Sequence, residues 1–189
     1  MVAVTTPAFQ LACGEDSGTP AVIQSDDGSE VFSTGAGVQF RAQVVASNIE
    51  VPWALAFVPD GRLFVTERPG RVRVIENGQL LSEPALTLQD VFMQGEAGLL
   101  GRAVDPDFTS NRFVYLLYSA IRPGQSAVNR VVRFQEANNT LIDAVTILHG
   151  IPADRLHDGG RLRFGPDDHL YLTMGAMSWL RVLHRTWVS

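Results

Sequence analysis

One short pattern occurs three times along the chain and restricts the folds available to it. Each copy has an apolar pair, then Pro-Asp, then a few turn residues, then a strand rich in Val, Leu, Phe and Tyr. Proline fixes φ for a turn and Asp bonds to neighbouring backbone N–H groups, so each copy predicts an antiparallel hairpin. The copies read AFVPDGRLFVTE, AVDPDFTSNRFVYLLYS and RFGPDDHLYLTMG, with prolines at Pro59, Pro106 and Pro166.

Further β-rich runs follow the first two hairpins, at residues 71–76 and 129–135. Several short antiparallel strands that recur every 40–50 residues or more are typical of the blades of a β-propeller, roughly four strands per blade. A β-sandwich also has regular turns, but it does not require a repeated Pro-Asp hairpin, so the propeller is favoured. No stretch shows a long helical period, and we predict an all-β fold.

Propellers close with roughly four to eight blades, whereas this chain has room for about the first two to three. We therefore expect only part of a propeller, over residues 38–176. Residues 13–37 are rich in Gly, Ser, Asp and Thr and lack a sustained apolar pattern, and residues 1–37 are predicted to be a disordered extension, or a signal or lipoprotein tether. Residues 177–189 hold two of the three tryptophans and no acidic residue, which suggests an atypical, frameshifted or truncated tail.

The composition restricts the classes of partner that this protein is expected to bind. The 189 residues are 46% hydrophobic and 19% charged, as in globular proteins, and the net charge of −5 gives no attraction to nucleic acid. No apolar run reaches the roughly 18 residues of a membrane span. The single cysteine, Cys13, excludes an intrachain disulfide. The polar residues after Cys13 resemble those after a lipoprotein cleavage site, so the sequence allows Cys13 to be either a lipid anchor or an ordinary thiol.

The clearest chemical feature is His157, which is followed by Asp-Gly-Gly-Arg-Leu directly before the third hairpin. Two glycines allow tight backbone geometry, so the imidazole can project beside a ligand. Histidine has an unperturbed pKa near neutrality, which suits it to remove a proton from a hydroxyl. A single histidine in a turn is equally explained as a surface or packing residue.

Three segments in this order carry a resemblance: VPWALAFVPDGRLFVTERPGRVRVIENG, GEAGLLGRAVDPDF and HDGGRLRFGPDDHLYLTMG. Together they resemble the first part of the soluble glucose/sorbosone (aldose sugar) dehydrogenase family, over roughly residues 41–175. The resemblance implies a six-bladed propeller that holds pyrroloquinoline quinone (PQQ), usually with Ca²⁺, and oxidises the C1 hydroxyl of an aldose to a lactone. It also implies a periplasmic or extracellular location.

Within that resemblance, His157 matches the histidine that removes the hydroxyl proton. Glu96 stands where the glucose dehydrogenase branch has a Gln near cofactor and substrate, and Arg161 is a candidate contact for the anionic cofactor. Glu96 is equally explained as a solvated loop carboxylate, and Arg161 as a structural charge. The expected metal ligands fall largely outside this chain, and no metal-ligating residue is assigned.

Two positions depart from the family pattern. Leu156 stands where the glucose dehydrogenase branch has Asp, and Ala176 stands where the family has an Asp that orients the catalytic imidazole. A non-catalytic propeller that binds carbohydrate or protein is therefore the alternative to a dehydrogenase. We also expect the isolated 189-residue chain to lack activity, because later blades carry most of the implied cofactor cradle.

Overall fold

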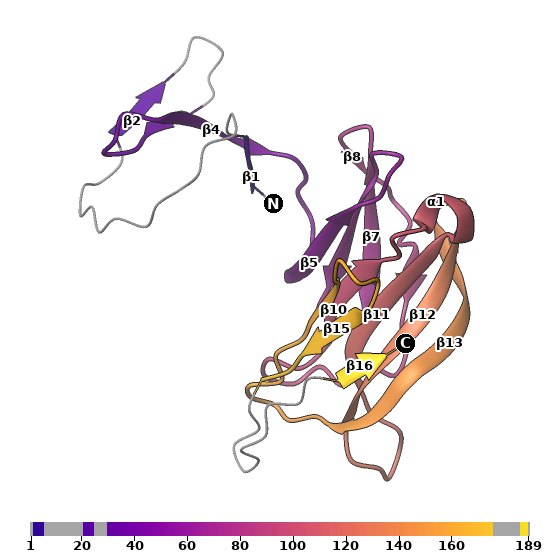
Figure 1. The fold of residues 1–189 in the computed structure, drawn as a ribbon. Helices are drawn as coiled ribbons and strands as arrows, with labels where there is room; N and C mark the ends of the chain where they lie inside the picture. Colours follow the sequence, from indigo (N-terminus) through magenta and orange to yellow (C-terminus); the bar gives the residue numbers. More distant parts are fainter. Residues whose placement is uncertain (1, 6–20, 25–29, 176–185, 189) are drawn as a thin grey trace. The chain divides into compact units, whose positions relative to one another are not determined.

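The computed structural model describes residues 2–5, 21–24, 30–175 and 186–188. The chain divides into two compact units, Met1–Ser47 and Asn48–Ser189. Among the described residues, strands dominate and the short helix α1, Phe108–Asn111, interrupts them (Figure 1), which confirms the all-β prediction. The described part of the chain contains no helix with the length and apolar character needed to cross a membrane.

The first unit contains a four-stranded antiparallel sheet with the order β1-β4-β3-β2. The rings of Phe32 and Phe40, which face each other in the register of β3 and β4, stack with centroids 5.3 Å apart. Residues 1–37, predicted as a disordered extension or as a signal or lipoprotein tether, contain the described strands β1, β2 and β3, and the unit ends at Ser47. Short runs rich in Val and Ile favour extended pairing even where flanking residues are polar. The strands are β1 Val2–Thr5, β2 Ala21–Gln24, β3 Glu30–Ser33 and β4 Gln39–Val44.

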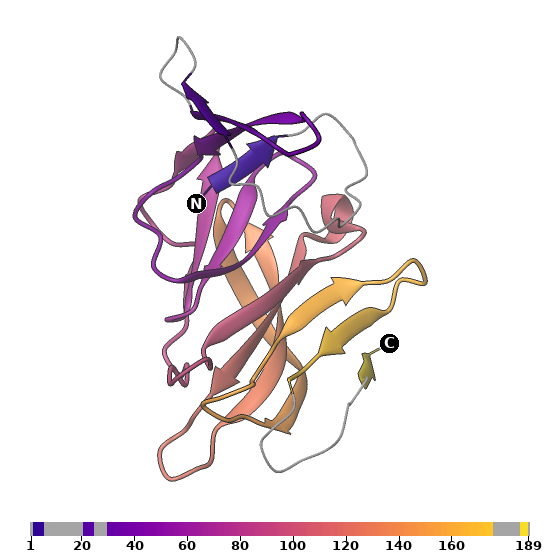
Figure 2. The same ribbon diagram turned by 90° about the vertical axis from the view of Figure 1, so that its left-hand side faces the viewer.

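The second unit is built from three antiparallel sheets, visible side by side in Figures 1 and 2. Sheets two and three follow the chain in order, as a meander does. In sheet one the first four strands do so, and the last strand pairs back with the third. Sheet one contains β5 Pro52–Phe57, β6 Leu63–Glu67, β7 Arg71–Glu76, β8 Gln79–Leu80 and β9 Leu86–Thr87. Sheet two contains β10 Leu99–Val104, β11 Phe113–Ala120, β12 Val128–Ala137 and β13 Thr140–Pro152. Sheet three contains β14 Arg161–Phe164, β15 Leu170–Thr173 and β16 Thr186–Val188.

The three Pro-Asp repeats fall where the sequence predicted hairpins. Pro59 lies between β5 and β6, Pro106 between β10 and β11, and Pro166 between β14 and β15, and each strand pair is antiparallel. The repeat therefore joins the first two strands of each of the three sheets in the second unit, so these sheets are equivalent units. Of the tail predicted over residues 177–189, only Thr186–Val188 is described, and it pairs with β15.

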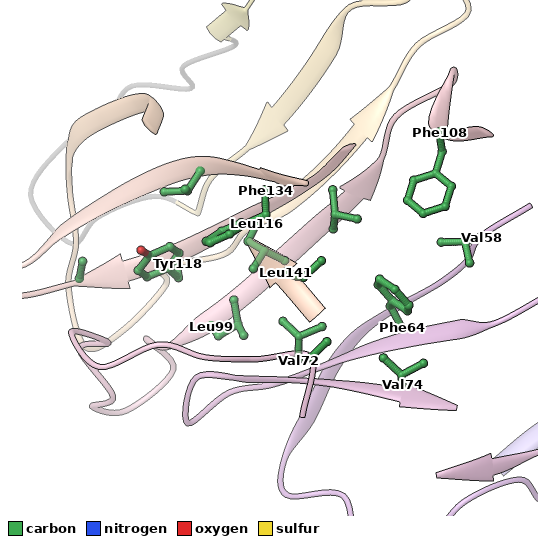
Figure 3. Packing of buried hydrophobic residues seen from close by; sticks show 14 residues of the cluster. Val58, Phe64, Val72, Val74, Leu99, Phe108, Leu116, Tyr118, Phe134 and Leu141 are labelled. Carbon is green, nitrogen blue, oxygen red and sulfur yellow. The ribbon is translucent and has the colours of Figure 1, made fainter. Parts of the chain in front are cut away.

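Sheets one and two share one apolar layer (Figure 3). Alternate residues of a strand point to one face of a sheet, and Phe64, Val72 and Val74 place their side chains on the same face of sheet one. Sheet two supplies Leu116 and Phe134 to the same cluster. The cluster also holds Val58, Ala85, Leu99, Phe108, Val114, Tyr118, Ala120, Val132 and Leu141.

The opposite face of sheet two packs against sheet three. Leu117 and Val131 lie in a second apolar cluster with Leu162, Leu170 and Leu172. Sheet two is thus covered on both faces, which explains the near-continuous apolar sequence of β11.

A buried ion cluster joins sheets one and two at the turn of the first repeat. Arg62 donates hydrogen bonds to Asp60 at 2.7 Å and to Glu136 of β12 at 2.8 Å. Glu136 is 2% exposed and also pairs with Arg112. Burial is the largest single influence on Glu136 and opposes its ionisation. The hydrogen bonds from Arg62 and from the backbone N–H of Asn139, with the charges of Arg62 and Arg112, together outweigh burial and hold the pKa of the carboxyl below its usual value.

Phe64 and Phe57 provide a test of the shared layer. Phe64 is 0% exposed in the layer, whereas Phe57, on β5, is 71% exposed. We expect Phe64→Ala to lower the free energy of unfolding by about 3–5 kcal/mol, because it removes packed atoms and leaves a cavity. The matched control Phe57→Ala is expected to stay within about 0.5 kcal/mol of the parent. Equal losses in denaturant titrations of the two variants would contradict this account of the core.

Candidate active site

His157 lies in the loop between β13 and β14, with its side chain exposed. Its backbone is in the left-handed region at φ 58°, and Gly159 and Gly160 follow at 64° and 109°. The left-handed region is uncommon for a residue with a side chain and persists where surrounding contacts hold it. The loop conformation is therefore set by its neighbours.

One of those neighbours is Glu96, in the loop before β10. The backbone N–H of His157 donates to Oε2 of Glu96 at 2.7 Å. In return, the backbone N–H of Glu96 donates to the carbonyl of Arg155 at 2.7 Å. Arg68 donates from Nη1 to the carbonyl of Gly95. The two loops are therefore joined by reciprocal hydrogen bonds, and the first is held in turn by a guanidinium from sheet one.

Two glycines permit this close approach. A Cβ added to Gly95 would lie 2.2 Å from the carbonyl oxygen of Arg155, and one added to Gly175 would lie 1.9 Å from that of His157. No side chain fits at such distances from backbone atoms. Glycine at both positions lets the three segments around His157 pack backbone to backbone.

On its other side, the loop is fixed by Asp158, which is 1% exposed. Its Oδ2 lies 2.5 Å from Oγ of Ser119 in β11, and its Oδ1 accepts from Nδ2 of Asn129 in β12 at 2.7 Å. Both partners are also buried. The sequence interpretation missed this cluster because its members are 29 and 39 residues from Asp158. The one sequence signal was Ser119, a polar residue in the otherwise apolar strand β11.

The structure thus brings His157 and Glu96 together, through the main chain of His157. Arg161 stands at the start of β14 with an exposed side chain, and within the described residues that side chain makes no hydrogen bond or ion pair. Leu156 is exposed, and Ala176 lies outside the described residues. No three His, Cys, Asp or Glu side chains gather at one point in the described part of the chain.

A family model described as Glucose / Sorbosone dehydrogenase matches residues 49–182. The chain belongs to this family. The sequence resemblance is confirmed, and the three sheets of the second unit are blades of a β-propeller, of which the chain holds only part.

Relatives of this glucose/sorbosone dehydrogenase family chain include two sugar dehydrogenases. It is 32% identical over 140 residues to aldose sugar dehydrogenase YliI of Escherichia coli (strain K12), covering 71% of this chain and 38% of the relative. The PQQ-bound aldose sugar dehydrogenase of Streptomyces coelicolor is 32% identical with a TM-score of 0.63, covering 70% of this chain and 40% of that one. Human Hedgehog-interacting protein is 31% identical over 155 residues, covering 72% of this chain and 22% of that protein.

The chain therefore spans less than half the length of each of these relatives. It is related to oxidoreductases that act on sugars, and the part that it shares with them contains His157, Glu96 and Arg161.

The contact between Glu96 and the His157 loop can be tested by amide hydrogen exchange. We expect Glu96→Ala to speed exchange of the His157 amide on the order of tenfold, or about 1.4 kcal/mol, because the variant removes its acceptor. Glu83→Ala, at an exposed loop carboxylate elsewhere on sheet one, is the matched control and should leave that amide unchanged. Unchanged exchange in Glu96→Ala would contradict the reciprocal bonding of the two loops.

Proposed function

We propose that this chain carries the proton-abstracting part of a sugar dehydrogenase that uses PQQ, with His157 as the general base. The observation that supports it most directly is an exposed histidine whose loop is fixed on both sides, by Glu96 and by Asp158. A base works best when its ring is held where the reacting proton will be. Membership in the glucose/sorbosone dehydrogenase family supplies the substrate class.

In this mechanism the unprotonated nitrogen of the His157 imidazole takes the proton of the C1 hydroxyl of an aldose. Bound PQQ would supply the hydride acceptor, and the sugar would leave as a lactone. The Glu96 carboxylate has one oxygen on the His157 main chain, which leaves Oε1 to accept a hydrogen bond from a sugar hydroxyl. Glu96 thus orients both the base loop and the substrate.

The described residues fit part of a PQQ site. The exposed guanidinium of Arg161 makes no ion pair within the described part of the chain, and a guanidinium suits a carboxylate of the cofactor. The described residues do not provide a calcium site, because no cluster of carboxylates that could bind Ca²⁺ is found among them. No step is therefore assigned to a metal here.

The role of His157 can be tested in full-length protein that joins this chain to the later blades of the family's propeller and is reconstituted with PQQ and Ca²⁺, by following reduction of an artificial electron acceptor by aldoses. We expect His157→Ala to lower kcat by roughly 10²–10⁴-fold, the usual contribution of a general base. His149→Ala removes an exposed histidine on β13 and is the matched control, with an expected kcat near that of the parent. Turnover by His157→Ala at the parent rate would refute the assignment.

A non-catalytic propeller that binds a protein surface is the second candidate. It is favoured by the likeness to Hedgehog-interacting protein, whose name describes binding and not oxidation. The two candidates differ in their affinity for the cofactor. A protein that only binds another protein has no reason to retain saturable PQQ binding.

We expect calorimetric titration of the same full-length protein with PQQ to show saturable binding, weakened roughly fivefold, or about 1 kcal/mol, by Arg161→Ala. Arg122→Ala, at an exposed arginine in the turn between β11 and β12, is the control and should bind as the parent does. Absence of any PQQ binding would favour the protein-binding candidate. Equal binding by both variants would remove Arg161 from the site.

The family resemblance also supports a periplasmic or extracellular location, which we propose for this protein and which cell fractionation would test. Cys13, the predicted site of a lipid anchor, lies outside the described residues. The electron acceptor is not assigned.

A further inference from the structure

Asp158, Ser119 and Asn129 form a buried cluster next to His157. If Asp158 is ionised, the cluster has fewer hydrogens than it has hydrogen-bond contacts. Three short contacts form a closed ring: Asp158 Oδ2 to Ser119 Oγ at 2.5 Å, Ser119 Oγ to Asn129 Oδ1 at 2.8 Å, and Asn129 Nδ2 to Asp158 Oδ1 at 2.7 Å. Each contact needs one hydrogen between its two atoms. A hydroxyl has one proton to donate, and an ionised carboxylate has none.

With an ionised Asp158, the ring lacks one proton. The Asn129 amide donates its hydrogen to Asp158. The Ser119 hydroxyl has one hydrogen, which it can donate either to Asp158 or to Asn129 but not to both. One contact would then bring two acceptor oxygens together at hydrogen-bond distance.

Turning the Asn129 amide does not remove the deficit, although amide orientation is always a matter of assignment. The amide nitrogen of Asn129 would then donate to Oγ of Ser119, and the Ser119 hydroxyl would donate to Asp158. The amide oxygen would, however, face both the Asp158 carboxyl at 2.7 Å and the carbonyl of Pro152 at 3.4 Å. In either orientation one further proton is needed, and the carboxyl of Asp158 is the remaining group that can carry it.

The surroundings of Asp158 agree with this count. Its side chain is almost fully buried, and within the described residues it makes no ion pair with any arginine, lysine or histidine. Its one other partner is the backbone N–H of Asp154 at 3.3 Å. A buried carboxylate without a cation is strongly disfavoured, whereas a buried carboxylic acid with all its hydrogen bonds made is tolerated.

We propose that Asp158 is held in its acid form and closes a hydrogen-bonded ring with Ser119 and Asn129 that positions the His157 loop. The ring joins the residue next to His157 to the two central strands of sheet two, which contribute side chains to both apolar clusters. Asp158 is thus a positioning residue for the base, and it acts without a charge beside the imidazole. The link to catalysis rests on the proposed role of His157, whereas the ring itself does not.

Infrared and nuclear magnetic resonance spectra of the full chain at pH 7, without PQQ or sugar, test the proposal. In the infrared difference between parent and Asp158→Asn, we expect loss of one carbonyl band of a protonated carboxylic acid. Asp168→Asn, at an exposed aspartate in the turn between β14 and β15, is the matched control and should show loss of carboxylate bands. Loss of carboxylate bands in Asp158→Asn would overturn the acid form.

The positioning role is read from the amide and imidazole signals of His157. Asn can replace a carboxylic acid in the ring, because its NH₂ donates to Ser119 and its oxygen accepts from Asn129. We therefore expect Asp158→Asn to keep the His157 signals within the scatter of Asp168→Asn, and Asp158→Ala to shift or broaden them. Ser119→Ala breaks the ring with a smaller change and should shift the same signals if Asp158→Ala does not fold.

Unchanged His157 signals in Ser119→Ala would overturn the positioning role, as would equal disturbance by Asp158→Asn and Asp158→Ala. Because neither measurement uses cofactor or substrate, a failure of the proposed dehydrogenase function leaves both results interpretable. Conversely, an active enzyme with an ionised Asp158 would reject the ring and keep His157 as the base.

Discussion

The apolar layer between sheets one and two is the constraint on which the other features depend. Phe64, Leu116 and Phe134 are excluded from water there, and the layer on the other face of sheet two leaves that sheet covered on both sides. Burial of this kind supplies most of the stability of a small β domain. It also requires that every polar group carried into the layer find a partner.

One buried polar cluster meets that requirement, and one buried arginine does not. The cluster of Arg62 and Glu136 is ionic, and the mutual hydrogen bonds keep both groups charged although they are buried. Arg102 on β10 lacks such partners, because within the described residues its Nε and Nη1 make no hydrogen bond. Burial, reinforced by the charge of Arg163, lowers the pKa of Arg102 to about 9.

The candidate site lies in loops that extend from the packed sheets of the second unit. His157 has a strained backbone and an exposed side chain, which is the combination expected of a residue held in place for chemistry and not for packing. Its supports come from three separate segments, around Gly95, Ser119 and Gly175. The described residues therefore fix the His157 loop among themselves, although the chain covers 40% of the PQQ-bound relative.

The sequence by itself determined the repeated hairpins, the all-β class, the family and the position of His157, because proline, glycine and strand periodicity act over a few neighbouring residues. The partners of the His157 loop were decided only by the tertiary structure. Ser119 and Asn129 reach Asp158 because β11 and β12 pair in one register, and their polar side chains gave no sign of a shared partner along the chain. Glu96 was identified from the sequence, but its bond to the His157 main chain was not, because that contact joins residues 61 positions apart.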